Sequence, residues 1–189
     1  MELCTQLFLG ALDGLDDTEL DEPALLEGWT RRHLAAHVHY NAEGLRRLVS
    51  WAATGAENRM YANPEQRTSE IEAGVKLPAD KLRALLSGSA KALDTDLDAL
   101  AAEAWHAQVV TAQGRTVLAT EIPWMRTREV AVHAVDLDTG IGFDTLPDEL
   151  NTALCVDVIR KREASGETAV LAAWLTGRTT TAPVLGPWL

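Results

Sequence analysis

Residues 122–137 read IPWMRTREVAVHAVDL, a stretch that predicts one amphipathic helix with Pro123 tolerated in its first turn. Glu129 and His133 lie four positions apart within it, so their side chains stack one helical turn apart on the same face. A carboxylate and an imidazole held in this way can form two corners of a metal site. Taken alone, such a pair more often forms an ion pair on the protein surface.

Apolar residues recur at helical spacing on both sides of this stretch. Long helices are predicted over about residues 3–20, 31–53 and 78–100, and a further helix over about residues 147–164. A short helix over about residues 67–74 and a hairpin around Gln113-Gly114 complete the pattern. The four long helices of the first 138 residues predict a mainly α protein built as a helical bundle. In bundles, metal sites are formed by inward side chains on facing helices.

The helix predicted over residues 31–53 supplies a histidine for such a site. At about 100° per residue, His37 falls on the same arc as the leucines, whereas His39 falls on the opposite arc and is expected to face solvent. An inward Glu129 and two inward histidines need partners, because a buried unpaired charge is costly. A divalent cation would satisfy His37, Glu129 and His133 together.

The residue types leave several assignments open. His33 lies four positions before His37 and is an alternate ligand. Two imidazoles and one carboxylate suit zinc with a fourth position open, while nickel, iron and manganese are also compatible. Asp136 either orients the His133 ring or is a solvated acid near the helix end. Arg126 also falls on the inner arc of its helix, and the alternative for this residue is an ion pair on the protein surface.

The composition is that of an acidic globular protein. Of the 189 residues, 47% are apolar and 24% charged, and the formal net charge of −11 argues against nucleic acid or an anionic membrane as a partner. No apolar run approaches the roughly 20 residues needed to span a bilayer, and the N-terminus lacks the basic stretch of a signal peptide. Cys4 and Cys155 lie far apart, so we expect reduced thiols and a cytoplasmic protein.

Three runs resemble the mycothiol-dependent maleylpyruvate isomerase family, which belongs to the wider group of DinB-like metal-binding four-helix bundles. They are GWTRRHLAAH at residues 28–37, MY at 60–61 followed by RTSEI at 67–71, and the stretch at 122–137. The resemblance covers residues 1 to about 165 in order, and WLTGR at residues 174–178 is similar to a run in the C-terminal part of the family.

The resemblance implies a DinB-like bundle over residues 1–142 and a C-terminal segment over residues 143–189. Family members usually carry a fuller α/β domain after the bundle, so this segment is expected to be a short, reduced α/β appendage. The substrate pocket is therefore harder to predict than the metal site.

The same resemblance assigns roles to individual residues. The metal ligands of the family fall on His37, Glu129 and His133, and we expect zinc as the metal. His37 and Arg67 are expected to be catalytic, and Arg67 also to bind the substrate. Arg178 is the match for a second functional arginine of the family, and it joins Arg126 as a predicted substrate-binding residue.

The activity that the resemblance implies is the isomerisation of maleylpyruvate to fumarylpyruvate with mycothiol as the thiol cofactor; no residue is assigned to mycothiol. Two alternatives stay open, a mycothiol S-transferase or detoxification enzyme on the same scaffold and a non-catalytic bundle. The expected partners are a small dicarboxylate or another electrophile and a low-molecular-weight thiol, bound by a monomer or a small homo-oligomer.

Overall fold

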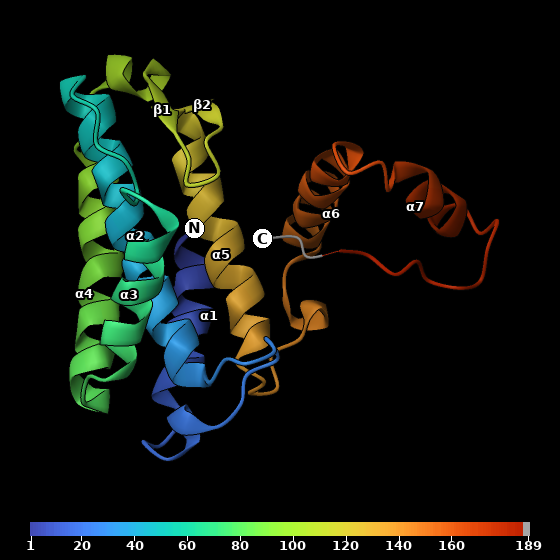
Figure 1. Cartoon of the computed structure of the whole chain (residues 1–189), viewed down its shortest axis with the longest axis horizontal. Coiled ribbons are helices and arrows are strands. Elements are labelled where there is room, and N and C mark those ends of the chain that lie inside the picture. Colours follow the sequence, from blue (N-terminus) through green and yellow to red (C-terminus); the bar gives the residue numbers. More distant parts are fainter. Residues whose placement is uncertain (187–189) are drawn as a thin grey trace. The chain divides into compact units, whose positions relative to one another are not determined.

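The structure is a computed structural model that describes residues 1–186, and it divides into two compact units, Met1–Ile141 and Gly142–Leu189. The first unit contains the five helices α1 (Glu2–Asp13), α2 (Arg31–Thr54), α3 (Pro64–Val75), α4 (Ala79–Asp98) and α5 (Ile122–Asp136) (Figure 1). Its short elements are the 3-10 turns Glu19–Asp21, Ala102–His106 and Ala119–Glu121 and the strands β1 (Gln108–Val110) and β2 (Thr116–Leu118). The predicted mainly α bundle is confirmed.

Helix α2 is the central element of the bundle, because it packs against α3, α4 and α5. Thr30 and His33 form a capping box at its N-terminus, and Gly55 ends it in the left-handed conformation with φ of 72°. Leu34, Leu45 and Leu48 are fully buried along it. A helix covered on several sides buries more than one arc of its surface.

This position of α2 corrects the prediction for His39, which was expected to face solvent. His39 is only 7% exposed, and its Nδ1 lies 2.9 Å from the Ser89 hydroxyl on α4. The single-arc description of α2 fails because α4 covers the side of the helix opposite to α5.

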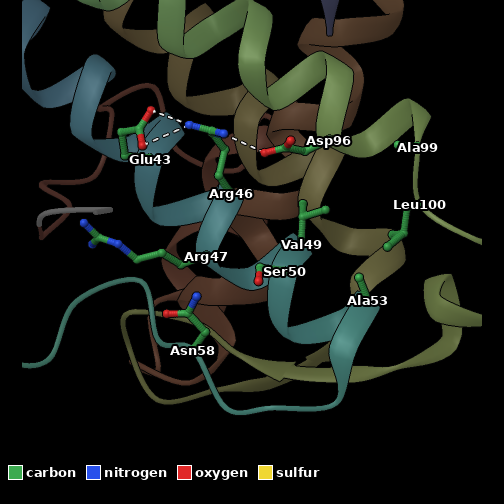
Figure 2. A pocket seen from close by; sticks show the side chains of 10 residues that line it. All are labelled: Glu43, Arg46, Arg47, Val49, Ser50, Ala53, Asn58, Asp96, Ala99 and Leu100. Carbon is green, nitrogen blue, oxygen red and sulfur yellow. Dashed lines mark hydrogen bonds and ion pairs between the residues drawn. The ribbon is translucent and has the colours of Figure 1, made fainter.

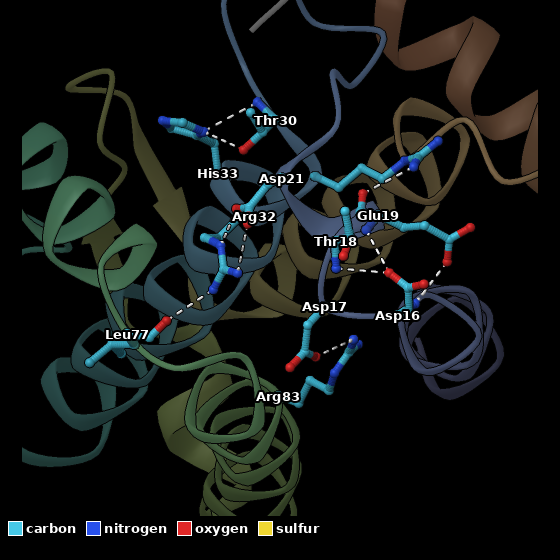
Figure 3. Close-up of polar contacts among 11 residues, drawn as sticks. Asp16, Asp17, Thr18, Glu19, Asp21, Thr30, Arg32, His33, Leu77 and Arg83 are labelled. Carbon is cyan, nitrogen blue, oxygen red and sulfur yellow. Dashed lines mark hydrogen bonds and ion pairs between the residues drawn. The ribbon is translucent and has the colours of Figure 1, made fainter.

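The first predicted helix is shorter than its apolar spacing indicated, since α1 ends at Asp13. Asp16 then accepts hydrogen bonds from the backbone amides of Thr18 and Glu19, each at 2.8 Å (Figure 3). An aspartate that binds its neighbouring amides favours a turn over a continuing helix. The chain therefore leaves the helix here and forms the 3-10 turn Glu19–Asp21.

Strands β1 and β2 form the hairpin that was predicted around Gln113-Gly114. They pair in antiparallel register with Val109 opposite Val117, and Gly114 has a φ of 79°, which favours glycine in the turn. Val109 is fully buried in the core. The hairpin is followed by the 3-10 turn Ala119–Glu121 and then by α5, the helix that carries Glu129 and His133.

The second unit contains helices α6 (Asp148–Glu163) and α7 (Thr168–Leu175) and the 3-10 turn Phe143–Thr145. No strand occurs in its described residues, which corrects the expected α/β character of residues 143–189; the last three residues of that segment lie outside the described part. Residues 168–175 read TAVLAAWL, and their alanines and leucines have high helix propensity, so this tail forms α7. Within residues 1–186, no helix is long and apolar enough to cross a membrane.

Candidate metal centre

Helices α2 and α5 bring together the three residues predicted as metal ligands. One ligand atom from each of His37, Glu129 and His133 lies within 4.8 Å of the other two. Glu129 Oε2 is 3.1 Å from His37 Nε2 and 3.4 Å from His133 Nε2. The two rings meet edge to face with centroids 4.9 Å apart, and each histidine is only 5% exposed. The cluster is therefore buried and convergent.

The charges within the cluster are strongly coupled. Burial raises the pKa of Glu129, but the contacts with His133 and His37 outweigh it and hold this pKa well below its usual range. Burial also opposes protonation of His133, yet Asp136 and Glu129 raise its pKa to about 9. For His37, burial prevails over the contact with Glu129 and lowers the pKa. At neutral pH, the metal-free cluster therefore contains an ionised Glu129, a protonated His133 and a neutral His37.

The donor set fits a divalent metal ion. His133 Nε2 is buried and has no hydrogen-bond partner among the described residues, although it points at the carboxylate of Glu129. A buried polar atom without a partner is unusual, and a metal ion bound between the three side chains would provide one. Two imidazole nitrogens and a carboxylate oxygen suit zinc with an open fourth position.

Asp136 holds the His133 ring in place. His133 Nδ1 donates a hydrogen bond to Asp136 Oδ2 at 2.8 Å, so the other ring nitrogen is directed at the cluster. Metal-binding histidines usually donate their second ring N–H in this way. The contact predicted for Asp136 is therefore present.

Arg67 lies beside the cluster on α3. Its Nη2 donates to His37 Nδ1 at 3.3 Å, and the residue is half-buried. α3 is fixed against α2 by the ion pair between Glu70 and Arg47 at 3.2 Å and by close packing at Gly74. The structure thus brings together four of the residues that the sequence singled out: Arg67 and the three predicted ligands.

The other candidates lie elsewhere. His33 Nδ1 contacts Thr30 Oγ1 at 2.8 Å in the capping box of α2, and His33 is not part of the cluster (Figure 3). Arg126 is 1% exposed and donates to Val38 O and Asn41 Oδ1 at 2.8 and 3.0 Å, so its observed contacts are within the bundle core. Arg178 is an exposed residue of the second unit.

Trp29 and Tyr61 also surround the site, and neither was predicted to do so. The ring of Trp29 meets that of His37 edge to face with centroids 5.5 Å apart. Burial raises the pKa of Tyr61 to about 12, and both Arg67 and Glu129 contribute to its electrostatic environment. Both residues lie within the sequence runs that resemble the family, and this was the signal that could have identified them.

A separate surface pocket is not the candidate site. It has a volume of about 470 Å³ and is lined by residues of α2 and α4 and of the loops that follow them (Figure 2). Arg46, its central cation, is already paired with Asp96 at 2.6 Å and with Glu43 at 3.1 Å. None of the cluster residues lines this pocket.

The geometry defines a class of protein, a helical bundle with a buried His-Glu-His cluster between facing helices. Residues 1–138 match the family described as the mycothiol maleylpyruvate isomerase N-terminal domain. The chain belongs to this family. No curated protein sequence matches the chain significantly.

Two solved structures are similar to the chain. They are crystal structures of the mycothiol-dependent maleylpyruvate isomerase and of a histidine-to-alanine mutant of it. Each is 44% identical to the chain, with a TM-score of 0.81 over 84% of this chain. The match spans 66% of each solved chain, so the chain covers slightly less than two thirds of their length.

Proposed function

We propose that this protein is a thiol-dependent cis–trans isomerase that converts maleylpyruvate to fumarylpyruvate with mycothiol. The observation that carries the proposal is the buried cluster of His37, Glu129 and His133 with Arg67 beside it, in a member of the isomerase family. The 44% identity to a mycothiol-dependent maleylpyruvate isomerase supports the choice of thiol and substrate.

The proposed reaction makes a rigid double bond temporarily single. The thiolate sulfur of mycothiol adds to an alkene carbon and forms a C–S bond, while the π electrons move onto the conjugated carbonyl oxygen as an enolate. Rotation about the new C–C single bond follows. The enolate then expels the thiolate and restores the alkene in the trans form, so the thiol is regenerated and nothing is oxidised or reduced.

The residues of the cluster would hold a divalent metal ion, and we propose zinc. When bound, such an ion would lower the pKa of a thiol at its open position, which makes thiolate present at neutral pH. His37, Glu129 and His133 would hold the ion, and Asp136 would keep the His133 ring directed at it. We assign the metal-binding domain to residues 1–142 and leave residues 143–189 as a separate C-terminal segment.

The substrate is a dianion, so cationic side chains are needed to bind it. The planar guanidinium of Arg67 suits a carboxylate through two parallel hydrogen bonds, and Arg67 lies next to His37. Roles for Arg126 and Arg178 in substrate binding remain predictions. We further propose that the protein acts in the cytoplasm, where low-molecular-weight thiols are kept reduced; its two cysteines, Cys4 and Cys155, are both unpaired.

The proposal is tested by adding maleylpyruvate and mycothiol to the zinc-loaded protein and following fumarylpyruvate. We expect conversion that requires the thiol, and an Arg67→Met variant with a KM raised about tenfold or more, because a charged hydrogen bond to the substrate is lost. Maleylpyruvate left untouched would contradict the proposal. Accumulation of a stable thiol adduct without fumarylpyruvate would instead identify an S-transferase.

A further inference from the structure

The two ring nitrogens of His37 have partners of opposite kinds. Nε2 lies 3.1 Å from the carboxylate of Glu129, which can only accept a hydrogen bond when ionised. Nδ1 lies 3.3 Å from Nη2 of Arg67, and a guanidinium can only donate. A neutral imidazole has one N–H and one lone pair, so here the proton is on Nε2 and the lone pair of Nδ1 faces Arg67.

His133 has the reverse arrangement. Its Nδ1 donates to Asp136 at 2.8 Å, and its Nε2 points at Glu129 without forming a hydrogen bond to any described residue. This is the arrangement of a metal-binding histidine, whose outer nitrogen donates to a carboxylate, a carbonyl or water. His37 therefore differs from His133 in the partner of its outer nitrogen, which is the guanidinium of Arg67 and not a carboxylate.

A neutral His37 can offer the Nε2 lone pair to a metal ion only when its proton is on Nδ1, and that N–H would then meet the N–H of Arg67. Two donors cannot share a hydrogen bond. We propose that Arg67 competes with the metal for His37: it holds the metal-free tautomer and must leave His37 when the ion binds. The released guanidinium is then free for a substrate carboxylate, a step that rests on the proposed function.

Arg67, and not His37, is the side chain that can move. His37 is buried between α2 and α5, with the ring of Trp29 packed against it at a centroid distance of 5.5 Å. Arg67 is half-buried on a long flexible side chain. Its helix is anchored without it, because Asn63 caps α3 at Gln66 and Glu70 pairs with Arg47. A change of rotamer is therefore sufficient, and no helix needs to move.

The competition predicts that metal and dicarboxylate favour each other's binding. A dicarboxylate that pairs with Arg67 removes the donor from His37 and so increases the affinity for the metal. By thermodynamic linkage, the metal increases the affinity for the dicarboxylate by the same factor. Removing the Arg67 guanidinium should abolish this coupling while raising the intrinsic metal affinity.

Zinc affinity, measured by competition with a chromophoric chelator, tests the proposal without thiol or turnover. We expect Arg67→Met to bind zinc about tenfold more tightly than the wild type, because a charge-assisted hydrogen bond no longer opposes the metal. Saturating maleate should tighten zinc binding in the wild type and should leave it unchanged in Arg67→Met. Arg115→Met removes the same charge from the exposed hairpin and should leave zinc affinity unchanged.

Nitrogen-15 spectra of labelled histidine separate the hydrogen-bond effect from simple charge repulsion. In the zinc-free wild type, we expect the His37 proton on Nε2, and in the zinc-loaded protein on Nδ1. Equal zinc affinities for wild type and Arg67→Met, or a zinc-free His37 with its proton on Nδ1, would overturn the proposal. Neither result depends on whether the protein isomerises maleylpyruvate, so failure of this inference is distinct from failure of the proposed function.

Discussion

His37 and His39 lie two positions apart on α2 and are both buried, yet they have different partners. His37 contacts Glu129 on α5, whereas His39 contacts Ser89 on α4. Burial alone therefore does not make a histidine a candidate metal ligand. What distinguishes His37 is that a carboxylate and a second imidazole converge on the same point.

These two histidines form a matched pair of variants. His37→Ala should lower zinc affinity by more than about 100-fold and abolish activity while the leucine-rich bundle stays folded. His39→Ala should keep its zinc and lose about 1–3 kcal/mol of stability, because it removes a buried side chain and its hydrogen bond to Ser89. Metal analysis and chemical denaturation measure both effects. Equal zinc content in His37→Ala and in the wild type would show that His37 is not a metal ligand.

His133 predicts how metal binding depends on pH. Its pKa is raised to about 9, so it is protonated at neutral pH in the metal-free protein, and a metal ion must displace that proton. Zinc affinity should therefore rise with pH up to about 9 and then level off, with about one proton released per ion at pH 7. Calorimetry in buffers of different ionisation enthalpy measures the release. A zinc affinity that is constant between pH 7 and 9 would contradict this account.

The pKa shifts also affect the stability of the metal-free protein. The raised pKa of His133 contributes stability that is fully present below its unfolded value of about 6.5 and is lost as the pH rises through about 9. The lowered pKa of Glu129 contributes stability that is present above its unfolded value and is lost as the pH falls through the folded value. Zinc-free protein should accordingly be less stable at pH 10 than at pH 6.

At the scale of elements, the contact between α2 and α3 positions Arg67. A Cβ added at Gly74 would lie 2.8 Å from Ala36 Cβ and 3.1 Å from Tyr40 Cε2, so the two helices approach closely only because this residue is glycine. The close packing at Gly74 and the ion pair between Glu70 and Arg47 together hold the helix that carries Arg67 against α2.

Gly74→Ala should push α3 away from α2 and cost about 1–3 kcal/mol, because both neighbours are held in a packed helix. Gly88→Ala is the control, since no atom lies within 4 Å of a Cβ added at that exposed position of α4. There the substitution should stabilise the protein by about 0.5–1 kcal/mol through helix propensity. Urea denaturation distinguishes the two, and a shift in the same direction for both variants would contradict the packing argument.

The sequence predicted the positions of the helices better than the burial and the contacts of their side chains. Apolar spacing located α2, α4, α5 and α6 to within a few residues, and the Gln113-Gly114 pair indicated the hairpin. Face analysis of a single helix placed His37 inward but failed for His39, because it assumes that only one side of a helix is covered. The contacts of Asp136 and Arg67 with the two histidine rings depend on side-chain geometry that spacing does not specify.

At the scale of the whole molecule, every residue of the candidate metal centre belongs to the first compact unit. The fragment of residues 1–141 should therefore fold and bind zinc with the affinity of the full chain, because its core and its ligands are complete. Arg178→Met in the full chain should likewise keep its zinc, and any rise in its KM would reveal a role in substrate binding. Loss of zinc binding in the fragment would contradict this prediction.

The central claim is that the cluster of His37, Glu129 and His133 binds a metal ion on which thiol-dependent isomerisation depends. The most direct measurement is a titration of zinc into metal-free protein with maleylpyruvate and mycothiol present, followed as initial rate. We predict a rate that rises with zinc and saturates at about one ion per chain, with no rate in His37→Ala at the same zinc concentration. A rate that is absent at every zinc concentration, or that does not depend on zinc, would contradict the claim.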